Sequence, residues 1–456
     1  MENEKKRGTF SGKLGFVLSA AGASVGLGNI WRFPYLCAKY GGGIFLIIYI
    51  LLAVTFGYTM IIAETAIGRS TKKSPVGAFV FYSDNKIIRA GGWINAIIPI
   101  LIVPYYSVIG GWVTKYLFEY LHTDVNEIAA DGFFTGFITD GDSSELWFLV
   151  FTAIVLAIIF MGVRRGIESV SKIMMPILAV LAVVICIYSV TRPGALEGVK
   201  YCLIPNLSNF SLMTFVSAMG QMFYSLSIAM GILITFGSYV KNDVSIEAST
   251  EQVEVFDTAI AIIASLMIIP AVFAFSGGSA DTLKAGPSLM FITMPNIFAS
   301  MGFGRIIGIA FFLLVLFAAV TSAIALLESA VSTFTDEFKW NRNVATAVMG
   351  VVMIALGSLS SLGYGPLANV TIFNMQFLDF FDFLTNSVMM PIAALFTCLL
   401  IMRYMGLTKV AEEVELGGHK FKRKGMFNFM IRFLCPIFVV IILVSSIASV
   451  LGIISI

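Results

Sequence analysis

Apolar stretches long enough to cross a membrane recur along this chain of 456 residues. An α-helix needs roughly 20 apolar residues to span the hydrocarbon core of a bilayer. Hydrophobic residues make up 58% of the sequence and charged residues only 12%, which is more apolar surface than a soluble helical protein could bury. The sequence therefore predicts an all-α polytopic membrane protein and excludes a large soluble one.

Eleven membrane-spanning helices are expected from the hydropathy pattern. They cover residues 13–38, 41–69, 88–121, 145–162, 168–190, 212–240, 251–276, 302–337, 341–359, 373–402 and 427–454. Lys and Arg gather in alternate connections, whereas residues 122–145 hold six acidic residues and no Lys or Arg. The positive-inside rule then predicts a cytoplasmic N-terminus in the cell inner (plasma) membrane, and eleven crossings put the C-terminus on the extracytoplasmic side.

The remaining polar residues show no pattern typical of an enzyme or a channel. The five cysteines lack paired or metal-ligand spacing, and the two histidines fall in predicted loops. No nucleophile–base pair, phosphate loop or channel filter motif is visible. A formal net charge of +2 does not indicate a nucleic-acid partner. We therefore expect a transporter, with no catalytic residues and no nucleic-acid binding.

Small and polar residues interrupt two of the predicted spans. The first span contains AGASVGLGNIWRFPY at residues 21–35, and the sixth contains GQMFYSLSIAMG at residues 220–231. Small residues in membrane helices often mark close packing, but packing explains neither Gly28 nor the Asn29 that follows it. The alternative is a helix that unwinds where it lines a cavity. Corresponding breaks five helices apart indicate an inverted-repeat transporter with its site at mid-membrane.

An unwound helix offers ligands of two kinds. Its freed carbonyl groups can bind a cation, and a new half-helix N-terminus near Leu27 and Gly28 presents N–H groups that favour an anion. Such a surface suits a zwitterion together with Na⁺.

The residues around both breaks resemble the neurotransmitter:sodium symporter family. The resemblance covers about residues 7–440 and is carried by GASVGLGNIWRFPY (22–35), YGGGIF (40–45), AIGR (66–69), KAGPSLMFITMP (284–295) and LFAAVTSAIALLES (316–329). The number of spans, eleven, resembles that of the bacterial branch of this family, which includes tyrosine and multi-hydrophobic amino acid transporters. The resemblance implies the leucine-transporter fold and sodium-coupled amino acid import by alternating access. Proton-coupled transport on the same fold is the nearest alternative.

The expected fold has two five-helix inverted repeats with discontinuous helices 1 and 6, plus an eleventh helix. The chain would be divided into a cytoplasmic tail (1–12), a first repeat (13–190), an extracellular loop (191–211), a second repeat (212–402), a cytoplasmic loop (403–426) and the eleventh helix (427–456). A monomer or weak dimer surrounded by membrane lipid is expected.

The resemblance implies two Na⁺ sites built from hard oxygen ligands. The ligands of the first are the carbonyl of Ser24, the side chains of Asn29 and Ser225, the substrate carboxylate and, at or near one further position, Asp257. The ligands of the second are the carbonyls of Gly22, Val25 and Ala318 with the hydroxyls of Thr321 and Ser322. Taken alone, those two hydroxyls would be interpreted as bonding to their own helix backbone.

Asp257 has two interpretations. It follows Glu251 and Glu254, so it could lie in water at a cytoplasmic helix end, but a helix starting near residue 251 places it more than one turn inside. The family usually has Asn at this position, and chloride-dependent members bind Cl⁻ nearby to offset the sodium charge. A built-in carboxylate would replace that anion, which predicts chloride independence. A titratable group here would also allow proton antiport on the return step.

The resemblance implies an amino acid substrate, because Gly26 stands where amine transporters of the family carry an aspartate. Tyr106 resembles the tyrosine whose hydroxyl binds the substrate carboxylate. The amino group would meet the carbonyls of Ser24, Tyr224 and Ser225 and the hydroxyl of Ser227. The substrate side chain would lie among Ile102, Tyr106, Met230, Ser322 and Leu326. This lining favours a hydrophobic or aromatic amino acid, although Ala229 stands where Gly is frequent.

Two charged pairs resemble the family's gates. Arg32 and Asp382 correspond to the outer gate, with Asp379 as a nearby competitor for the arginine. Arg7 and Asp336 correspond to the cytoplasmic gate. An arginine within the membrane needs a carboxylate partner whatever its function.

Two further features bear on the cytoplasmic side. Phe10 replaces the usual Trp of the N-terminal latch. In the fifth span, Gly166 and Pro176 have a spacing at which bacterial members are thought to unwind and admit water to the second sodium site.

Overall fold

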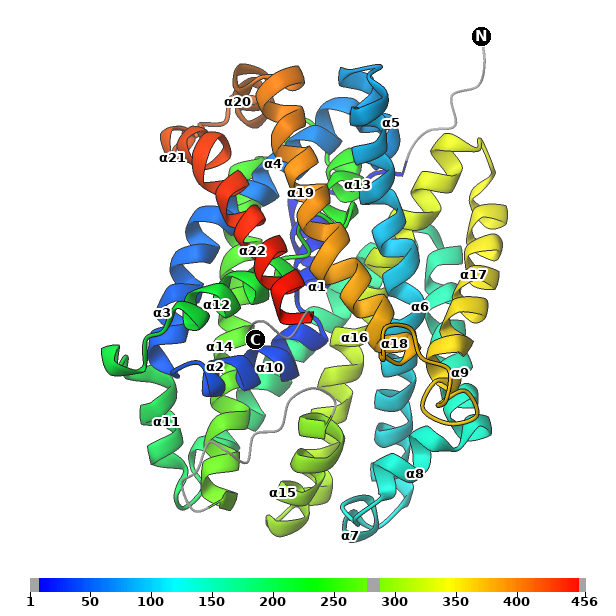
Figure 1. Ribbon diagram of the computed structural model, residues 1–456, viewed down its shortest axis with the longest axis vertical. Coiled ribbons are helices and arrows are strands. Elements are labelled where there is room, and N and C mark those ends of the chain that lie inside the picture. Colours follow the sequence, from blue (N-terminus) through cyan, green and yellow to red (C-terminus); the bar gives the residue numbers. More distant parts are fainter. Residues whose placement is uncertain (1–7, 277–287, 451–456) are drawn as a thin grey trace.

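The computed structural model describes residues 8–276 and 288–450 as a bundle of helices that run mostly along the longest axis of the molecule (Figure 1). Two isolated β-bridges, Gly42–Pro205 and Ile372–Met375, are the extended pairings found in this part of the chain. The prediction of an all-α protein is confirmed.

The first five spans contain the following elements. The first is α1 (Lys13–Ser24), a π-helical segment (Gly28–Arg32) and α2 (Phe33–Lys39). The second is α3 (Gly43–Leu52), a π-helical segment (Ala53–Gly57) and α4 (Tyr58–Thr71). The third is α6 (Lys86–His122) and the fourth is α9 (Gly141–Phe160). The fifth is a π-helical segment (Val163–Glu168) followed by α10 (Ser169–Val190).

The remaining spans follow in the same way. The sixth is α12 (Leu212–Ser225) and α13 (Ile232–Tyr239), the seventh α14 (Ile246–Ser276), the eighth α16 (Gly304–Glu337) and the ninth α17 (Arg342–Leu362). The tenth is α18 (Phe377–Asp382), α19 (Met390–Leu400) and π-helical segments Phe383–Met389 and Ile401–Met405. The eleventh is α21 (Lys424–Phe429), a π-helical segment (Met430–Leu434) and α22 (Cys435–Val450).

Short helices occupy several of the connections between the spans. At one end of the bundle lie α5 (Pro75–Tyr82) and α20 (Leu407–Glu415). Towards the other end lie α7 (Val125–Ile128), α8 (Phe133–Thr139), α11 (Ala195–Leu203), a 3₁₀ turn (Leu207–Asn209), a π-helical segment (Leu289–Thr293) and α15 (Met294–Ser300) (Figure 1). Except for the 3₁₀ turn, they have apolar residues to bury against the bundle, such as Val410 and Val414 of α20.

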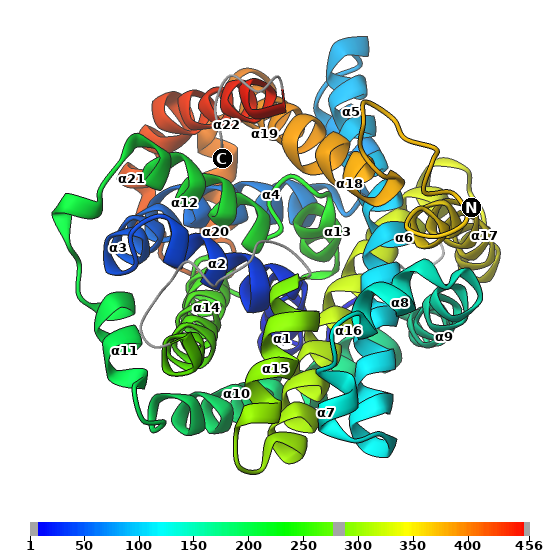
Figure 2. The same ribbon diagram turned by 60° about the horizontal axis from the view of Figure 1, so that its bottom comes forward.

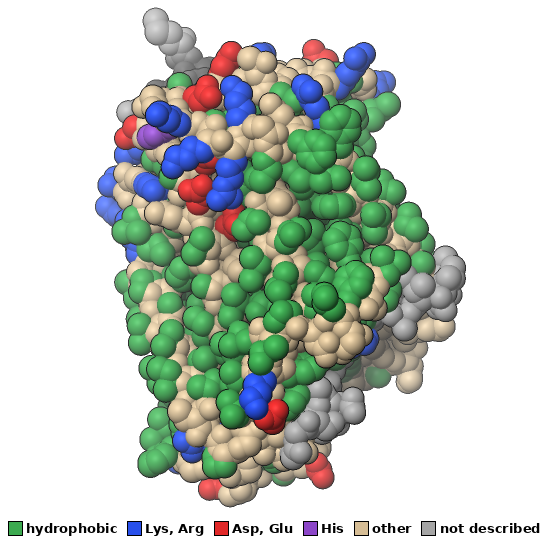
Figure 3. Space-filling model, turned by 90° about the vertical axis from the view of Figure 1, so that its left-hand side faces the viewer, with side chains coloured by type: hydrophobic (Ala, Val, Ile, Leu, Met, Phe, Trp, Pro, Cys, Tyr) green, Lys and Arg blue, Asp and Glu red, His purple; other side chains and the backbone are tan. Residues whose placement is uncertain are grey.

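On the face shown in Figure 3, hydrophobic side chains cover the middle of the molecule, and Lys and Arg side chains gather towards one end. Among the described residues, nine helices are long and apolar enough to span a membrane, and the bent pair α1 and Gly28–Lys39 makes a tenth. The two halves of the sixth span, α12 and α13, are each too short to be counted alone. This arrangement agrees with the eleven predicted spans.

The broken helices lie inside the bundle. Figure 2 shows α1 near the centre, with α9 and α17 on one side of the periphery and α3 and α11 on the other. The first span bends by 55° at its break, because Val25 has extended backbone and ends α1. In the sixth span residues 226–231 separate α12 from α13, and Ser227, Ala229 and Gly231 all have positive φ. Both predicted interruptions are therefore confirmed.

The fifth span remains helical at the Gly166–Pro176 spacing. The backbone is π-helical from Val163 to Glu168 and α-helical from Ser169 onward, with Pro176 inside the helix. The unwinding that this spacing was expected to permit is absent from the described conformation.

Candidate substrate and sodium site

The break in the first span gathers backbone carbonyl groups against α16. The Ser322 hydroxyl lies 3.2 Å from the carbonyl oxygen of Gly22, 3.3 Å from that of Ala23 and 3.3 Å from that of Val25. One hydroxyl hydrogen can satisfy only one of these acceptors at a time. The other carbonyl oxygens retain lone pairs that a cation could use.

The other predicted ligands of the second sodium site lie next to these carbonyls. The Thr321 hydroxyl donates to the carbonyls of Phe317 at 2.8 Å and Ala318 at 3.2 Å, within its own helix. An added Cβ on Gly22 would lie 3.0 Å from Thr321 Cβ. The structure therefore brings Gly22, Val25 and Ser322 together directly, with Thr321 and Ala318 on the adjoining turn. The donor set is all oxygen, which fits a hard cation.

A buried polar cluster joins the two breaks at the predicted first sodium site. The Asn29 amide nitrogen donates to Ser225 Oγ at 2.9 Å and to Asp257 Oδ1 at 2.8 Å. The Ser225 hydroxyl lies 3.2 and 3.1 Å from the two Asp257 carboxylate oxygens. The Asn29 amide oxygen accepts the N–H of Gly26 at 3.1 Å, and the Ser24 hydroxyl, also buried, makes no hydrogen bond with the described residues.

Asp257 does not lie in water, which excludes the first of the two interpretations of this residue. Its side chain is completely buried, and among the ion pairs formed by the described residues none involves it. A buried carboxylate without a cationic partner is unfavourable. The buried Asp257 carboxylate therefore favours the binding of a cation at this site.

Tyr49 completes the cluster and was not predicted. Its hydroxyl donates to Asp257 Oδ2 at 3.1 Å, and its ring is fully buried on α3. The signal available in the sequence was a single hydroxyl in the otherwise apolar helix GIFLIIYILL.

A cavity lies between the two breaks, α6 and α16. Its lining comprises Ala23, Ser24, Leu27, Gly28, Asn29, Ile102, Tyr106, Tyr224, Ser225, Ser227, Met230, Ile232, Ser322 and Leu326. Every predicted substrate residue except Gly26 is in this lining. Gly26 lies beside it, because an added Cβ would be 2.7 Å from Ser322 Oγ and 3.0 Å from the Tyr106 hydroxyl.

Polar groups hold the cavity wall in place. The Tyr106 hydroxyl accepts the backbone N–H of Leu27 at 3.3 Å, at the start of the second half of the broken helix. The Ser227 hydroxyl donates to the Ala23 carbonyl at 2.9 Å, linking the two breaks. Gly28 permits a close approach, since an added Cβ would lie 2.6 Å from Tyr224 Cε1.

Glu64 of α4 supports the second break and was also missed. It is fully buried, and its Oε1 accepts the N–H of Ala229 at 2.8 Å. Ala229 has a φ of +60°, which is unusual for a residue with a Cβ. A carboxyl group within an apolar span should have indicated a function by itself.

The ion pairs of the described residues do not include the two predicted outer-gate residues, Arg32 and Asp382. The Arg32 guanidinium lies over the Tyr224 ring, 5.4 Å from its centroid. The Asp382 carboxylate accepts hydrogen bonds from Asn386 Nδ2 at 2.6 Å and the Tyr105 hydroxyl at 3.3 Å.

Several side chains pack together at the end of the bundle that carries α5. Arg7 lies outside the described residues, and its predicted partner Asp336 accepts the N–H of Ser74 at 2.7 Å. Phe10 is buried, with its ring 5.5 Å from that of Phe236 and 5.9 Å from that of Tyr239. Phe10 is smaller than the Trp that the family usually has at this position, but it is still buried against other aromatic side chains.

An ion pair that was not predicted from the sequence lies next to Tyr239, the residue against which Phe10 packs. Arg342 of α17 binds Glu328 of α16 through two hydrogen bonds of 2.9 and 2.6 Å, and the Tyr239 hydroxyl donates to the same carboxylate at 2.7 Å. The carboxylate of Glu328 is fully buried, and its charge-assisted hydrogen bonds join α13, α16 and α17.

The chain matches one family model and several known proteins along most of its length. The model of the sodium:neurotransmitter symporter family matches residues 7–130 and 136–453. An uncharacterized sodium-dependent transporter of Bacillus subtilis (strain 168), YhdH, is 30% identical over 451 residues, covering 98% of this chain and 99% of that protein. The rat sodium- and chloride-dependent GABA transporter 2 is 26% identical over 474 residues, covering 91% and 77%.

A solved structure is also similar along the whole chain. The crystal structure of MhsT in complex with L-phenylalanine is 36% identical and matches with a TM-score of 0.87, covering 97% of this chain and 100% of that one. The fold is therefore the leucine-transporter fold, and the protein is a multi-pass membrane transporter and not an enzyme. The extent of the family match, together with the two broken helices around one cavity, shows that this chain belongs to the sodium:neurotransmitter symporter family.

Proposed function

We propose that this protein imports hydrophobic or aromatic L-amino acids together with Na⁺ by alternating access. The observation that carries the proposal is the junction of an apolar cavity with a buried carboxylate that has no cationic partner within the described structure. The cavity suits the substrate side chain, and the carboxylate suits an alkali ion. MhsT, whose crystal structure contains L-phenylalanine, supports the substrate class.

The roles of the lining residues follow from their chemistry. The substrate carboxylate binds the N–H groups at Leu27 and Gly28 and the Tyr106 hydroxyl, where the half-helix N-terminus favours an anion. The amino group faces carbonyl oxygens of the two breaks and the Ser227 hydroxyl. Ile102, Met230 and Leu326 surround the side chain, and Met230 can adapt to ligands of different shape.

Two Na⁺ ions accompany the substrate. The first binds Asn29, Ser225, Asp257 and the Ser24 carbonyl, and the second binds the carbonyls of the first break with Thr321 and Ser322. Each ion that enters down a membrane potential of 100 mV contributes about 2.3 kcal/mol. Asp257 makes transport independent of chloride, and its protonation after Na⁺ release would allow proton antiport.

The proposed orientation places the N-terminus in the cytoplasm and the C-terminus outside the inner (plasma) membrane. Residues 13–190 and 212–402 form the two inverted repeats. The charged end of the molecule in Figure 3 would then face the cytoplasm, in agreement with the positive-inside rule.

Binding of radiolabelled L-phenylalanine to the purified full-length protein tests the proposal. Binding should saturate in NaCl, persist in sodium gluconate, and disappear when choline replaces Na⁺ at fixed pH. Competition by each of the twenty amino acids should rank hydrophobic and aromatic ones first. Binding that survives in choline would instead support the proton-coupled alternative, and competition only by polar amino acids would refute the substrate class.

A further inference from the structure

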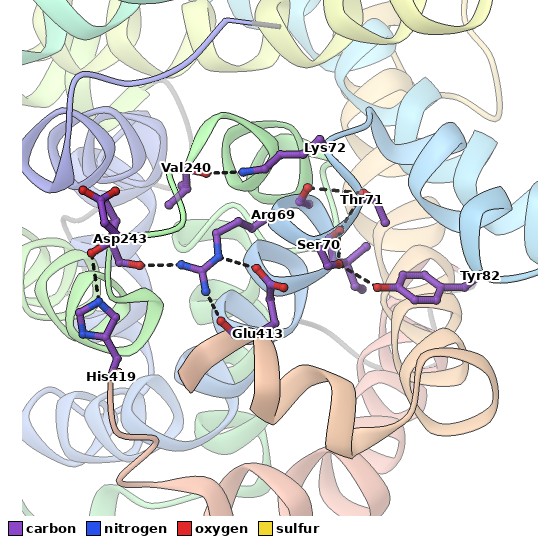
Figure 4. Close-up of polar contacts among 12 residues, drawn as sticks. Arg69, Ser70, Thr71, Lys72, Tyr82, Val240, Asp243, Glu413 and His419 are labelled. Carbon is purple, nitrogen blue, oxygen red and sulfur yellow. Dashed lines mark hydrogen bonds and ion pairs between the residues drawn. The ribbon is translucent and has the colours of Figure 1, made fainter. Parts of the chain in front are cut away.

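The segment 240–247 comprises the connection from α13 to α14 and the first two residues of α14, and it is attached to several distant parts of the chain (Figure 4). The Lys72 ammonium donates to the Val240 carbonyl at 2.5 Å. Arg69, at the end of α4, donates from Nη1 to the Val244 carbonyl at 2.6 Å. The His419 Nε2 lies 3.1 Å from the Asp243 carbonyl oxygen. These contacts involve residues that the site described above does not use.

Arg69 is the centre of this arrangement. Its side chain is completely buried, and its Nε forms an ion pair of 2.6 Å with Glu413 of α20. Its Nη2 also donates to the Glu413 backbone carbonyl. One guanidinium thus binds two segments at once, the 240–247 connection and α20. Lysine could not replace it, because a single ammonium lacks the planar set of donors.

The connection between the tenth and eleventh spans contacts the same segment at a second point. Glu247, which is buried at the start of α14, accepts the backbone N–H groups of Lys422 at 2.9 Å and Arg423 at 3.0 Å. The Tyr58 hydroxyl donates to the same carboxylate at 2.6 Å. Residues 407–423 therefore contact the 240–247 segment directly at Asp243 and Glu247 and are linked to Val244 through Arg69.

This placement matters because α13 closes the cytoplasmic side. Its last residue, Tyr239, accepts the N–H of Phe10 at its carbonyl at 3.1 Å and donates to Glu328. Any opening towards the cytoplasm must separate α13 from the N-terminal segment and α16. A contact that restrains the chain just beyond Tyr239 opposes that movement, and a transition occurs only when such differential contacts are exchanged.

We propose that Arg69 is a positioning residue for transport and that its pair with Glu413 is a cytoplasmic lock, defined here as Arg69, Glu413 and the Val244 carbonyl. The lock holds α20 against the 240–247 segment while the cytoplasmic side is closed, and it opens when that side opens. This inference rests on the alternating access of the proposed function. Weakening the lock shifts the protein towards its inward-open form.

Hydrogen exchange of the full-length protein, followed by mass spectrometry, tests the lock. Glu413→Gln keeps the shape of the side chain and removes its charge. Arg69→Lys keeps the charge and removes the planar set of guanidinium donors. Each variant should raise amide exchange in residues 240–247 and 8–24 by roughly tenfold, the effect of one charge-assisted hydrogen bond. The Na⁺ concentration that half-protects these segments should rise by a similar factor.

Glu415→Gln is the matched control, since Glu415 lies on the same helix in an exposed pair with Lys424. It should exchange like the wild type. Equal exchange in Glu413→Gln and wild type, or an equal increase in Glu415→Gln, would overturn the proposal. An increase in exchange that no Na⁺ concentration alters would show a purely structural role and would also overturn it.

The result remains separable from that of the proposed function. Sodium-dependent L-phenylalanine binding by the wild type tests the transport proposal alone. If that binding fails while Glu413→Gln still loosens residues 240–247, the function is refuted and the contact is structural.

Discussion

Replacing Asp257 by Asn removes the charge that the first sodium site depends on, with little change in shape. The carboxylate accepts hydrogen bonds from Asn29, Ser225 and Tyr49 at 2.8 to 3.2 Å, and an amide oxygen can still accept some of them. The substitution therefore tests charge and leaves packing nearly intact. Stability in detergent should change little.

The magnitude follows from Coulomb's law. A unit charge about 4 Å from a cation contributes about 4 kcal/mol at an effective dielectric constant of about 20. The amide dipole retains part of this attraction, and removing a buried charge relieves its desolvation, so we take about 2 kcal/mol as the net loss. That value corresponds to a roughly 30-fold rise in the Na⁺ concentration for half-maximal transport.

The assay is uptake of radiolabelled L-phenylalanine into proteoliposomes over a Na⁺ titration, in chloride and in gluconate. The wild type should be indifferent to the anion. Asp257→Asn should need about 30-fold more Na⁺ in gluconate and should recover partly in chloride, because a bound anion would restore the missing charge. Glu254→Gln, one turn earlier on α14, should show no anion effect. An unchanged Na⁺ requirement in Asp257→Asn would refute the assignment of this carboxylate.

Two further substitutions test the cavity. Tyr106→Phe removes the hydroxyl that accepts the N–H of Leu27. The dissociation constant for L-phenylalanine in saturation binding should rise roughly tenfold, the effect of one hydrogen bond to a charged group. An unchanged constant would contradict the proposal that Tyr106 binds the substrate carboxylate. Gly26→Ala places a Cβ 2.7 Å from Ser322 Oγ and should abolish uptake, whereas Gly220→Ala, where an added Cβ meets nothing within 4 Å, should transport normally; equal uptake by the two variants would exclude a steric role for Gly26.

The membrane class, the approximate spans and the position of both breaks could be predicted without a structure. These properties are local, because a bilayer selects apolar stretches of a fixed length and tolerates loose backbone only beside a cavity. The glycines around Asn29 and the polar residues at Ser225 and Ser227 therefore carried the prediction. Most of the residues that line the cavity were predicted from the family resemblance, because the motifs of this chain stand at the positions of the family's substrate-binding residues.

The contacts between side chains across the bundle could not be predicted in this way and were found in the folded chain. Tyr49 reaches Asp257, Glu64 reaches the N–H of Ala229, and Arg342 reaches Glu328. These pairs join helices far apart in sequence, and each depends on how a helix is rotated about its axis. Hydropathy cannot supply that rotation, since in a membrane helix the lipid-facing and buried faces are both apolar.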